Sequence, residues 1–98
     1  MASTTQRGGA NIVWAISPVD FDSTTAKSTN DKTISVTGAQ LGDPVILGGS
    51  ALPPANTNMK AFVSNTDEVT VRFCNFSGGT VDPDSFVATV GVVKLNQE

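Results

Sequence analysis

The C-terminal third of the chain shows the clearest alternation of apolar and polar residues. Between Glu68 and Cys74, apolar residues occupy every second position, namely Val69, Val71 and Phe73. A period of two is typical of a β-strand that buries one of its faces. We therefore predict a long strand here, and we expect the rest of the chain to be organised around it and the strand that follows.

The second long strand is predicted from Phe86 to Val93, where six of the eight residues are apolar and Gly91 is the only strand breaker. Its apolar side chains fall on both faces, which indicates a central strand or a strand that lies against a second surface. The segment 77–85 between the two strands is rich in turn residues, so we predict a turn there, with Gly78-Gly79 as a hairpin turn. In so small a protein, the second surface would come from another copy of the chain or from another protein.

Shorter apolar segments predict further strands, separated by segments rich in turn residues. The predicted strands are 11–16, 32–37, 45–47 and 59–64, and 19–22 is either a short strand or a continuation of the first after a bulge; the main predicted loops are 23–31 and 48–58. About seven short strands with turns between them favour an all-β fold, either an antiparallel β-sandwich or a jelly-roll-like barrel. We interpret residues 10–98 as one domain and residues 1–9 as an extended N-terminal arm.

Aromatic residues are few, and we expect most of them to lie in the core. They are Trp14, Phe21, Phe62, Phe73, Phe76 and Phe86. Trp14 is predicted to anchor the packing, in which case Trp14→Ala would cost about 3–5 kcal/mol. Cys74 lies in the middle of a predicted strand, and we expect it to be a small buried apolar residue.

Charge and composition narrow the possible partners. The chain has 98 residues with only 15% charged, a net charge of −3 and scattered cations, so we expect no binding to nucleic acid. Its apolar runs are shorter than the roughly 20 residues that span a bilayer, and no signal peptide opens the sequence, so we expect no membrane partner and synthesis in a cytoplasm. With few charges and little proline to protect the sheet edges, we expect a homo-oligomer.

The residue types present argue against catalysis. The sequence contains no histidine and no tyrosine and only one cysteine, so catalytic triads and zinc sites lack their usual groups. Asp20-Phe21-Asp22 and Asp82-Pro83-Asp84 could each offer two carboxylates to calcium, but a hard cation needs about six oxygens, and aspartates beside proline are common in turns. We therefore expect no enzyme activity, no cofactor and no bound metal.

Two segments carry a resemblance to a known family. The glycine-flanked turn in 36–43, VTGAQLGD, is followed after a variable loop by VTVRFCNFSG in 69–78 and by Val81-Asp82. This pattern resembles small β-proteins of tailed bacteriophages that decorate the capsid as cement proteins, and it is similar to modules at the tips of tail fibres. The likeness covers roughly residues 30–95. Cys74 departs from the valine or alanine expected at its position, and the N-terminal arm has no counterpart in the pattern.

The resemblance implies a virion protein, a homotrimer on the outer capsid surface that bridges subunits of the major capsid protein. A mildly acidic protein suits the outside of a shell, away from packaged DNA. The residues that we predict at the partner interface belong to the arm, to the glycine-flanked turn and to the last strand: Ala2, Ser3, Thr4, Thr5, Gln6, Arg7, Gly38, Leu41, Asp43, Val87 and Val93. The alternative is a receptor-binding or glycan-binding module at a tail-fibre tip, which would use loops 23–31 and 48–58.

Overall fold

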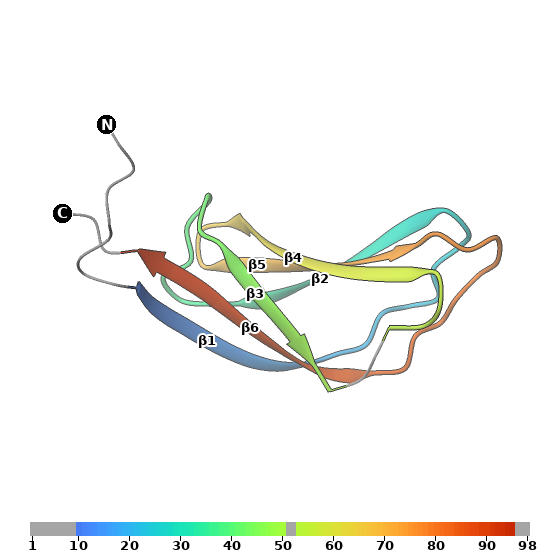
Figure 1. Ribbon diagram of the computed structural model, residues 1–98, viewed down its shortest axis with the longest axis horizontal. Helices are drawn as coiled ribbons and strands as arrows, with labels where there is room; N and C mark the ends of the chain where they lie inside the picture. The colour runs from blue at the N-terminus through green and yellow to red at the C-terminus, as the bar shows by residue number, and fades with distance from the viewer. Residues whose placement is uncertain (1–9, 51–52, 96–98) are drawn as a thin grey trace.

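The computed structural model describes residues 10–50 and 53–95, and these residues form six strands without a helix. The strands are β1 (Ala10–Val19), β2 (Ser28–Ser35), β3 (Val45–Gly49), β4 (Thr57–Asn65), β5 (Glu68–Asn75) and β6 (Phe86–Leu95). They make two three-stranded antiparallel sheets, with the orders β1-β6-β3 and β2-β5-β4 (Figure 1). The all-β prediction is confirmed, whereas the described residues contain six strands rather than about seven. The predicted arm, residues 1–9, lies outside the described residues.

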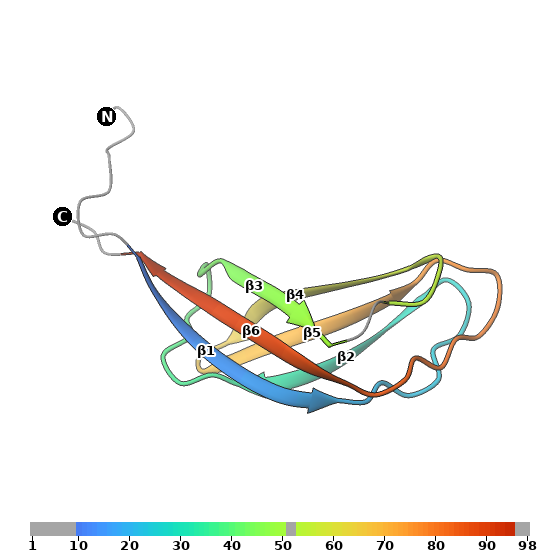
Figure 2. The same ribbon diagram turned by 60° about the horizontal axis from the view of Figure 1, so that its bottom comes forward.

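The two long strands predicted from the sequence are the central strands of the two sheets. β5 lies between β2 and β4, and β6 lies between β1 and β3. The inner faces of the sheets pack on each other as two layers (Figure 2), and their side chains form a continuous buried cluster. In it Phe21 lies against Phe73, with ring centroids 5.6 Å apart, and against Phe86 at 6.4 Å. Burial of this apolar surface supplies the main force that holds the layers together.

The predicted hairpin at Gly78-Gly79 is wrong, because β5 and β6 belong to different sheets. The segment 76–85 instead crosses from one layer to the other, a distance of about 10 Å between packed sheets. On the way it makes a two-way backbone bridge, in which Thr24 N–H donates to Val81 O at 2.8 Å and Val81 N–H donates to Thr24 O at 2.9 Å. The same turn residues suit a hairpin and a crossing connection, so the sequence pattern does not separate the two.

The strands differ from their predicted bounds, β1 and β2 the most, and β3 and β4 both extend into the predicted loop 48–58. β1 continues through Ser17-Pro18 to Val19, so 11–16 and the start of 19–22 belong to one strand. Proline is tolerated there because β1 is an edge strand. β2 begins at Ser28, inside the predicted loop 23–31, although its first four residues are polar. Those residues pair with β5, which places Asp31 opposite Arg72 on the outer face of the sheet.

The aromatic residues divide between the core and the surface. Phe21, Phe73 and Phe86 are buried, Phe62 is half-buried, and Trp14 and Phe76 are exposed, so the prediction that Trp14 anchors the core is wrong. The reason for Trp14 lies in the pleat of β1, whose Val13 and Ala15 pack against the core. Successive residues of a strand face opposite sides, so Trp14 points outward. Cys74 is buried, as the sequence predicts.

Candidate interaction surface

The outer face of the β1-β6-β3 sheet is covered by exposed apolar side chains. The strand register places Trp14 opposite Gly91 and Gly91 opposite Ile46, so these residues form one row across the sheet. Five exposed apolar residues of this sheet make up what we call the apolar outer face. They are Ile12, Trp14, Ile16, Ile46 and Val87, which are 39%, 54%, 71%, 46% and 44% exposed. Contiguous exposed apolar patches mark sites of contact with another protein, a membrane or a ligand.

No charged side chain interrupts this face within the described strands. Among residues 11–50 and 53–94, the remaining outward strand positions in the register are Pro18, Gly48, Thr89, Gly91 and Val93. Depletion of charge at the centre is what distinguishes protein–protein interfaces from the rest of a protein surface. The composition of this face therefore fits contact with another protein better than permanent contact with water.

Gly91 determines how Trp14 lies on the sheet. A Cβ atom at position 91 would stand 2.6 Å from Trp14 Cζ3, 2.9 Å from Trp14 Cε3 and 3.0 Å from Ile12 Cγ2. These distances are shorter than van der Waals contact, so only glycine lets the indole ring cover the central strand. The ring thereby forms a flat apolar platform in the middle of the apolar outer face.

We predict that Gly91→Ala displaces the indole ring without unfolding the protein. Trp14 is the only tryptophan, so its fluorescence reports its own surroundings alone. The emission maximum should move to longer wavelength and quenching by acrylamide should increase, because the ring loses its cover on the strand. Gly48→Ala is the control, since a Cβ there meets no atom closer than 4.0 Å. An unchanged spectrum in Gly91→Ala would contradict the described position of the ring.

The outer face of the other sheet has the opposite character. Arg72 on the central strand β5 donates to both carboxylate oxygens of Asp31, Nε at 2.9 Å and Nη2 at 3.0 Å. Its guanidinium also lies 5.0 Å from the centre of the Phe62 ring. The hydrogen bond from Arg72 holds the pKa of Asp31 below its ordinary value. Charged and hydroxyl side chains thus cover this face, which makes it suited to water.

The glycine-flanked turn joins the two sheets and is built mainly from backbone contacts. Gly38 and Gly42 have φ angles of +98° and +95°, which other residues adopt only with strain. Gly38 N–H donates to the Asp67 carboxylate at 2.7 Å, and Asp67 N–H donates to Ala39 O at 2.8 Å. Ala39 is fully buried under the turn, whereas Leu41 at its tip is 70% exposed. The turn therefore presents one apolar side chain on a fixed backbone.

Asp43 ties this turn to the end of β6. Lys94 Nζ donates to Asp43 Oδ2 at 2.6 Å, and Gln40 N–H donates to the same oxygen at 3.0 Å. The hydrogen bond from Lys94, followed by that from Gln40, holds the pKa of Asp43 below its ordinary value. Val93 N–H adds a bond of 2.9 Å to Pro44 O, so β3 starts in a defined position beside β6.

Low pH should therefore lower the free energy of unfolding, in part through protonation of Asp43. A carboxyl group whose pKa is lower in the folded state stabilises that state above its unfolded pKa, about 3.9 for Asp, and the contribution disappears as the pH falls through the folded pKa. The free energy of unfolding, measured with urea, should fall between pH 6 and pH 2.5. The fall should be smaller in Asp43→Asn, which does not titrate. An equal fall in both proteins would contradict this role of Asp43.

The predicted interface residues are only partly brought together. Ala2, Ser3, Thr4, Thr5, Gln6 and Arg7 lie outside the described residues. Gly38, Leu41 and Asp43 share the turn at one end of β6, near Val93, and Val87 lies toward the other end of the same strand. Sequence reasoning missed Trp14, Ile16 and Ile46. The sequence of β1 did indicate an exposed apolar face, because every residue from Ile12 to Ile16 is apolar and a strand of an outer layer can bury only one of its faces.

Within residues 10–50 and 53–95, no three potential metal ligands of the types His, Cys, Asp and Glu lie together. Asp20 and Asp22 are exposed on either side of the buried Phe21. In the part of the chain that the structure describes, no helix has the length and apolar character to span a membrane.

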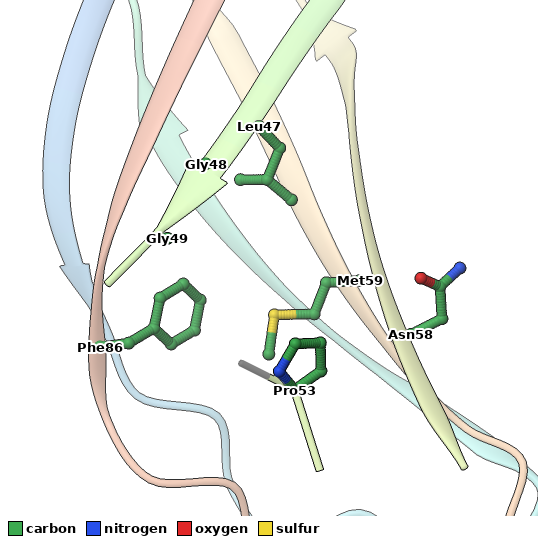
Figure 3. A pocket seen from close by; sticks show the side chains of 7 residues that line it. All are labelled: Leu47, Gly48, Gly49, Pro53, Asn58, Met59 and Phe86. Carbon is green, nitrogen blue, oxygen red and sulfur yellow. The ribbon is translucent and has the colours of Figure 1, made fainter. Parts of the chain in front are cut away.

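A small hollow opens where the edge strands of the two sheets approach each other (Figure 3). It has a volume of about 180 Å³ and is lined by Leu47, Gly48, Gly49, Pro53, Asn58, Met59 and Phe86. Pockets for small ligands usually measure about 300–1,000 Å³ and contain several converging polar groups. This hollow is smaller and mostly apolar, so it does not compete with the apolar outer face as a candidate site.

Comparisons with protein-family models, with curated proteins and with solved structures find no match to this chain. The features that bear on function are therefore the apolar outer face and the resemblance of the glycine-flanked turn and β5 to decoration proteins.

Proposed function

We propose that this chain is a non-enzymatic structural protein of a tailed bacteriophage that decorates the outer capsid surface and binds subunits of the major capsid protein. In this proposal the two packed sheets form a β-sandwich, because each sheet keeps two separate edge strands instead of closing into a barrel. The virion is its location, and the resemblance implies three copies in each assembly.

The observation that carries the proposal is the contrast between the two outer faces. One face exposes Trp14, Ile16 and Ile46 without a charge among the strand positions, and the other exposes charged and hydroxyl side chains. A protein that lies on a larger surface needs one face for contact and one face for water. The net charge of −3 also fits a position on the outside of a shell, away from packaged DNA.

Stabilisation of a shell requires no chemistry from the bound protein. A ligand that binds the assembled state and not the loose subunits stabilises the assembly by mass action, by about 2.7 kcal/mol per site at a hundredfold excess over the dissociation constant. A rigid module suits this task, because little conformational entropy is lost when it binds. The exposed Leu41 on its fixed turn offers a second apolar contact near the end of the same sheet.

Binding to capsids stripped of this protein tests the proposal. The wild-type protein should rebind, and the decorated capsids should survive a higher temperature than bare capsids. The double variant Ile46→Lys/Val87→Lys should bind at least tenfold more weakly, because it places two charges on the apolar outer face. Thr29→Lys/Thr33→Lys adds the same charges to exposed positions of the other sheet and should bind as the wild type does. Failure of the wild type to rebind would contradict the proposal.

The tail-fibre alternative receives less support from the geometry. A glycan site needs aromatic rings beside polar groups that bind sugar hydroxyls, whereas Trp14 is surrounded by aliphatic side chains. Phe76 is exposed near the predicted loop 23–31, where Lys27 Nζ donates to Phe76 O at 3.0 Å, but it is a single ring. If the protein fails to bind capsids and binds host-surface glycans instead, the fibre-tip function replaces the capsid function.

A further inference from the structure

The four edge strands of the two sheets differ in how they are protected against pairing. β2 carries Asp31 and Lys32, β4 carries Lys60 and a register irregularity near its end, and β3 has only five residues. Charges, prolines, bulges and short length are usual means by which proteins prevent edge-to-edge association. β1 has ten residues and not one charge, with a single proline near its end. Among the long edge strands of the described sheets, it is the one that this proline alone protects.

The register shows which backbone groups of β1 have no partner among residues 10–50 and 53–95. Val87 O accepts from Ser50 N–H at 3.0 Å, and Val93 N–H donates to Pro44 O at 2.9 Å, so the odd-numbered residues of β6 direct their backbone groups toward β3. The even-numbered residues of β6 therefore bond to β1, where they lie opposite odd-numbered residues. Backbone groups alternate in direction along an antiparallel strand. Ile12, Trp14 and Ile16 thus present their N–H and C=O groups to the open edge.

The backbone of Pro18 also faces the open edge, and it limits the length of β1 that can pair with another strand. It is an even-numbered residue of β1, so its nitrogen faces outward, where the missing N–H breaks no bond to β6. A strand added to this edge could therefore form complete pairs of hydrogen bonds with Ile12, Trp14 and Ile16 and not with Pro18. The segment centred on Trp14 is the part of β1 that is competent for pairing.

We propose that this edge pairs with β1 of a second copy of the chain, antiparallel about a two-fold axis at Trp14. In this register Ile12 lies opposite Ile16 of the partner subunit, and the two Trp14 residues lie opposite each other. All of the free backbone groups from Ile12 to Ile16 then find partners across the axis. The pairing segment is uncharged, so no like charges oppose one another, although each copy has a net charge of −3.

The distribution of acidic residues favours the antiparallel arrangement of two copies. The exposed residues Asp20, Asp22, Asp82 and Asp84 lie in the two connections that follow β1 and precede β6. The backbone bridge between Thr24 and Val81 holds these connections side by side, at the end of the molecule opposite to the start of β1 and the end of β6 (Figure 1). Antiparallel pairing places the acidic ends of the two copies far apart, whereas parallel pairing would bring them together.

The pairing has a consequence for the assembly. It joins the two β1-β6-β3 sheets into one continuous sheet, and the apolar outer faces of both copies then form one larger surface. A two-fold contact is closed when two copies have met, so it predicts a dimer, whereas the resemblance to decoration proteins implies a trimer. This contact between copies does not require binding to a capsid.

Analytical ultracentrifugation of the purified full chain tests this inference. The wild-type protein should show a reversible monomer–dimer equilibrium. Ile16→Pro removes one outward N–H and leaves the ladder with β6 intact, so it should weaken the dimer at least tenfold. Ile46→Lys is the matched control, because it charges the same face at a distance from the β1 edge, and it should change the dissociation constant less than threefold. Circular dichroism and thermal unfolding establish that each variant is folded.

A charge-pair experiment tests the register and does not depend on the proline variant. Trp14→Lys alone and Trp14→Glu alone should each be monomeric, because like charges meet on the two-fold axis. An equimolar mixture of the two should form a heterodimer. A mixture that stays monomeric would overturn the register centred on Trp14.

Three other results would overturn the pairing itself. The first is a wild-type trimer, and the second is a dimer that Ile46→Lys disrupts and Ile16→Pro does not, which would indicate contact through the outer face. The third is a monomer at every concentration. If that monomer still required Ile16 for capsid binding, the occupant of the edge would be a strand of another protein.

Discussion

Replacing Phe73 by alanine is expected to lower the free energy of unfolding by about 3–5 kcal/mol, a large share of the stability of a small domain. Phe73 is fully buried on the central strand β5, and its ring contacts Phe21 across the core. Removal of the ring leaves a cavity between the two layers that neighbouring side chains fill only in part. Urea unfolding followed by circular dichroism measures the loss.

Trp14→Ala provides the contrast for this prediction. A tryptophan that anchored the core would cost as much as Phe73, but Trp14 lies on the apolar outer face and is more than half exposed. We expect its loss to cost about 1 kcal/mol, because substitutions of surface residues have small effects on stability. Equal losses in Phe73→Ala and Trp14→Ala would contradict the described placement of Trp14.

Asn75→Ala is expected to destabilise the protein by about 3 kcal/mol, because it removes a buried amide that makes several hydrogen bonds, each with a net contribution of about 1 kcal/mol. Asn75 is buried at the end of β5, and its Nδ2 lies 3.0, 3.1 and 2.9 Å from the carbonyl oxygens of Thr24, Thr25 and Gly79. Its Oδ1 accepts from Ser77 N–H at 3.0 Å. One side chain therefore joins β5 to both connections at this end of the molecule.

The control for Asn75 is Asn58→Ala. Asn58 is an exposed asparagine of β4 that lies opposite Cys74, and its replacement should change the free energy of unfolding by less than about 0.5 kcal/mol. Amide hydrogen exchange adds a local measurement, since Val81 N–H, which donates to Thr24 O, should exchange faster in Asn75→Ala. A loss of stability no larger than that of Asn58→Ala would show that the asparagine does not hold these connections.

Local patterns were sufficient to predict the central strands but not their connection. The alternation of Val69, Val71 and Phe73 has one physical solution, a strand with one buried face, and the structure has that strand at the centre of a sheet. The turn residues of 76–85 suit a hairpin and a crossing connection equally. The choice between them depends on long-range contacts such as those of Asn75, which no short window of sequence contains.

Only some residues of the candidate surface could be predicted from the sequence, because the pattern of β1 does not show which of its faces is buried. Leu41 and Val87 were expected at an interface and are exposed. Trp14 was assigned to the core because large aromatic residues usually lie there, and β1 is apolar on both faces, so its pattern does not indicate which face is inside. The pairing with β6 decides this, since Gly91 leaves room for the indole ring on the outer side.

A reconstruction of decorated capsids by electron cryomicroscopy tests the central claim, that the apolar outer face is the contact surface of the assembly. We predict that the β1-β6-β3 sheet faces the shell, with Trp14 and Ile46 in contact with capsid protein and Arg72 and Asp31 facing water. Density that places the charged outer face of the β2-β5-β4 sheet against the shell, and leaves Trp14 and Ile46 open to solvent, would contradict the account.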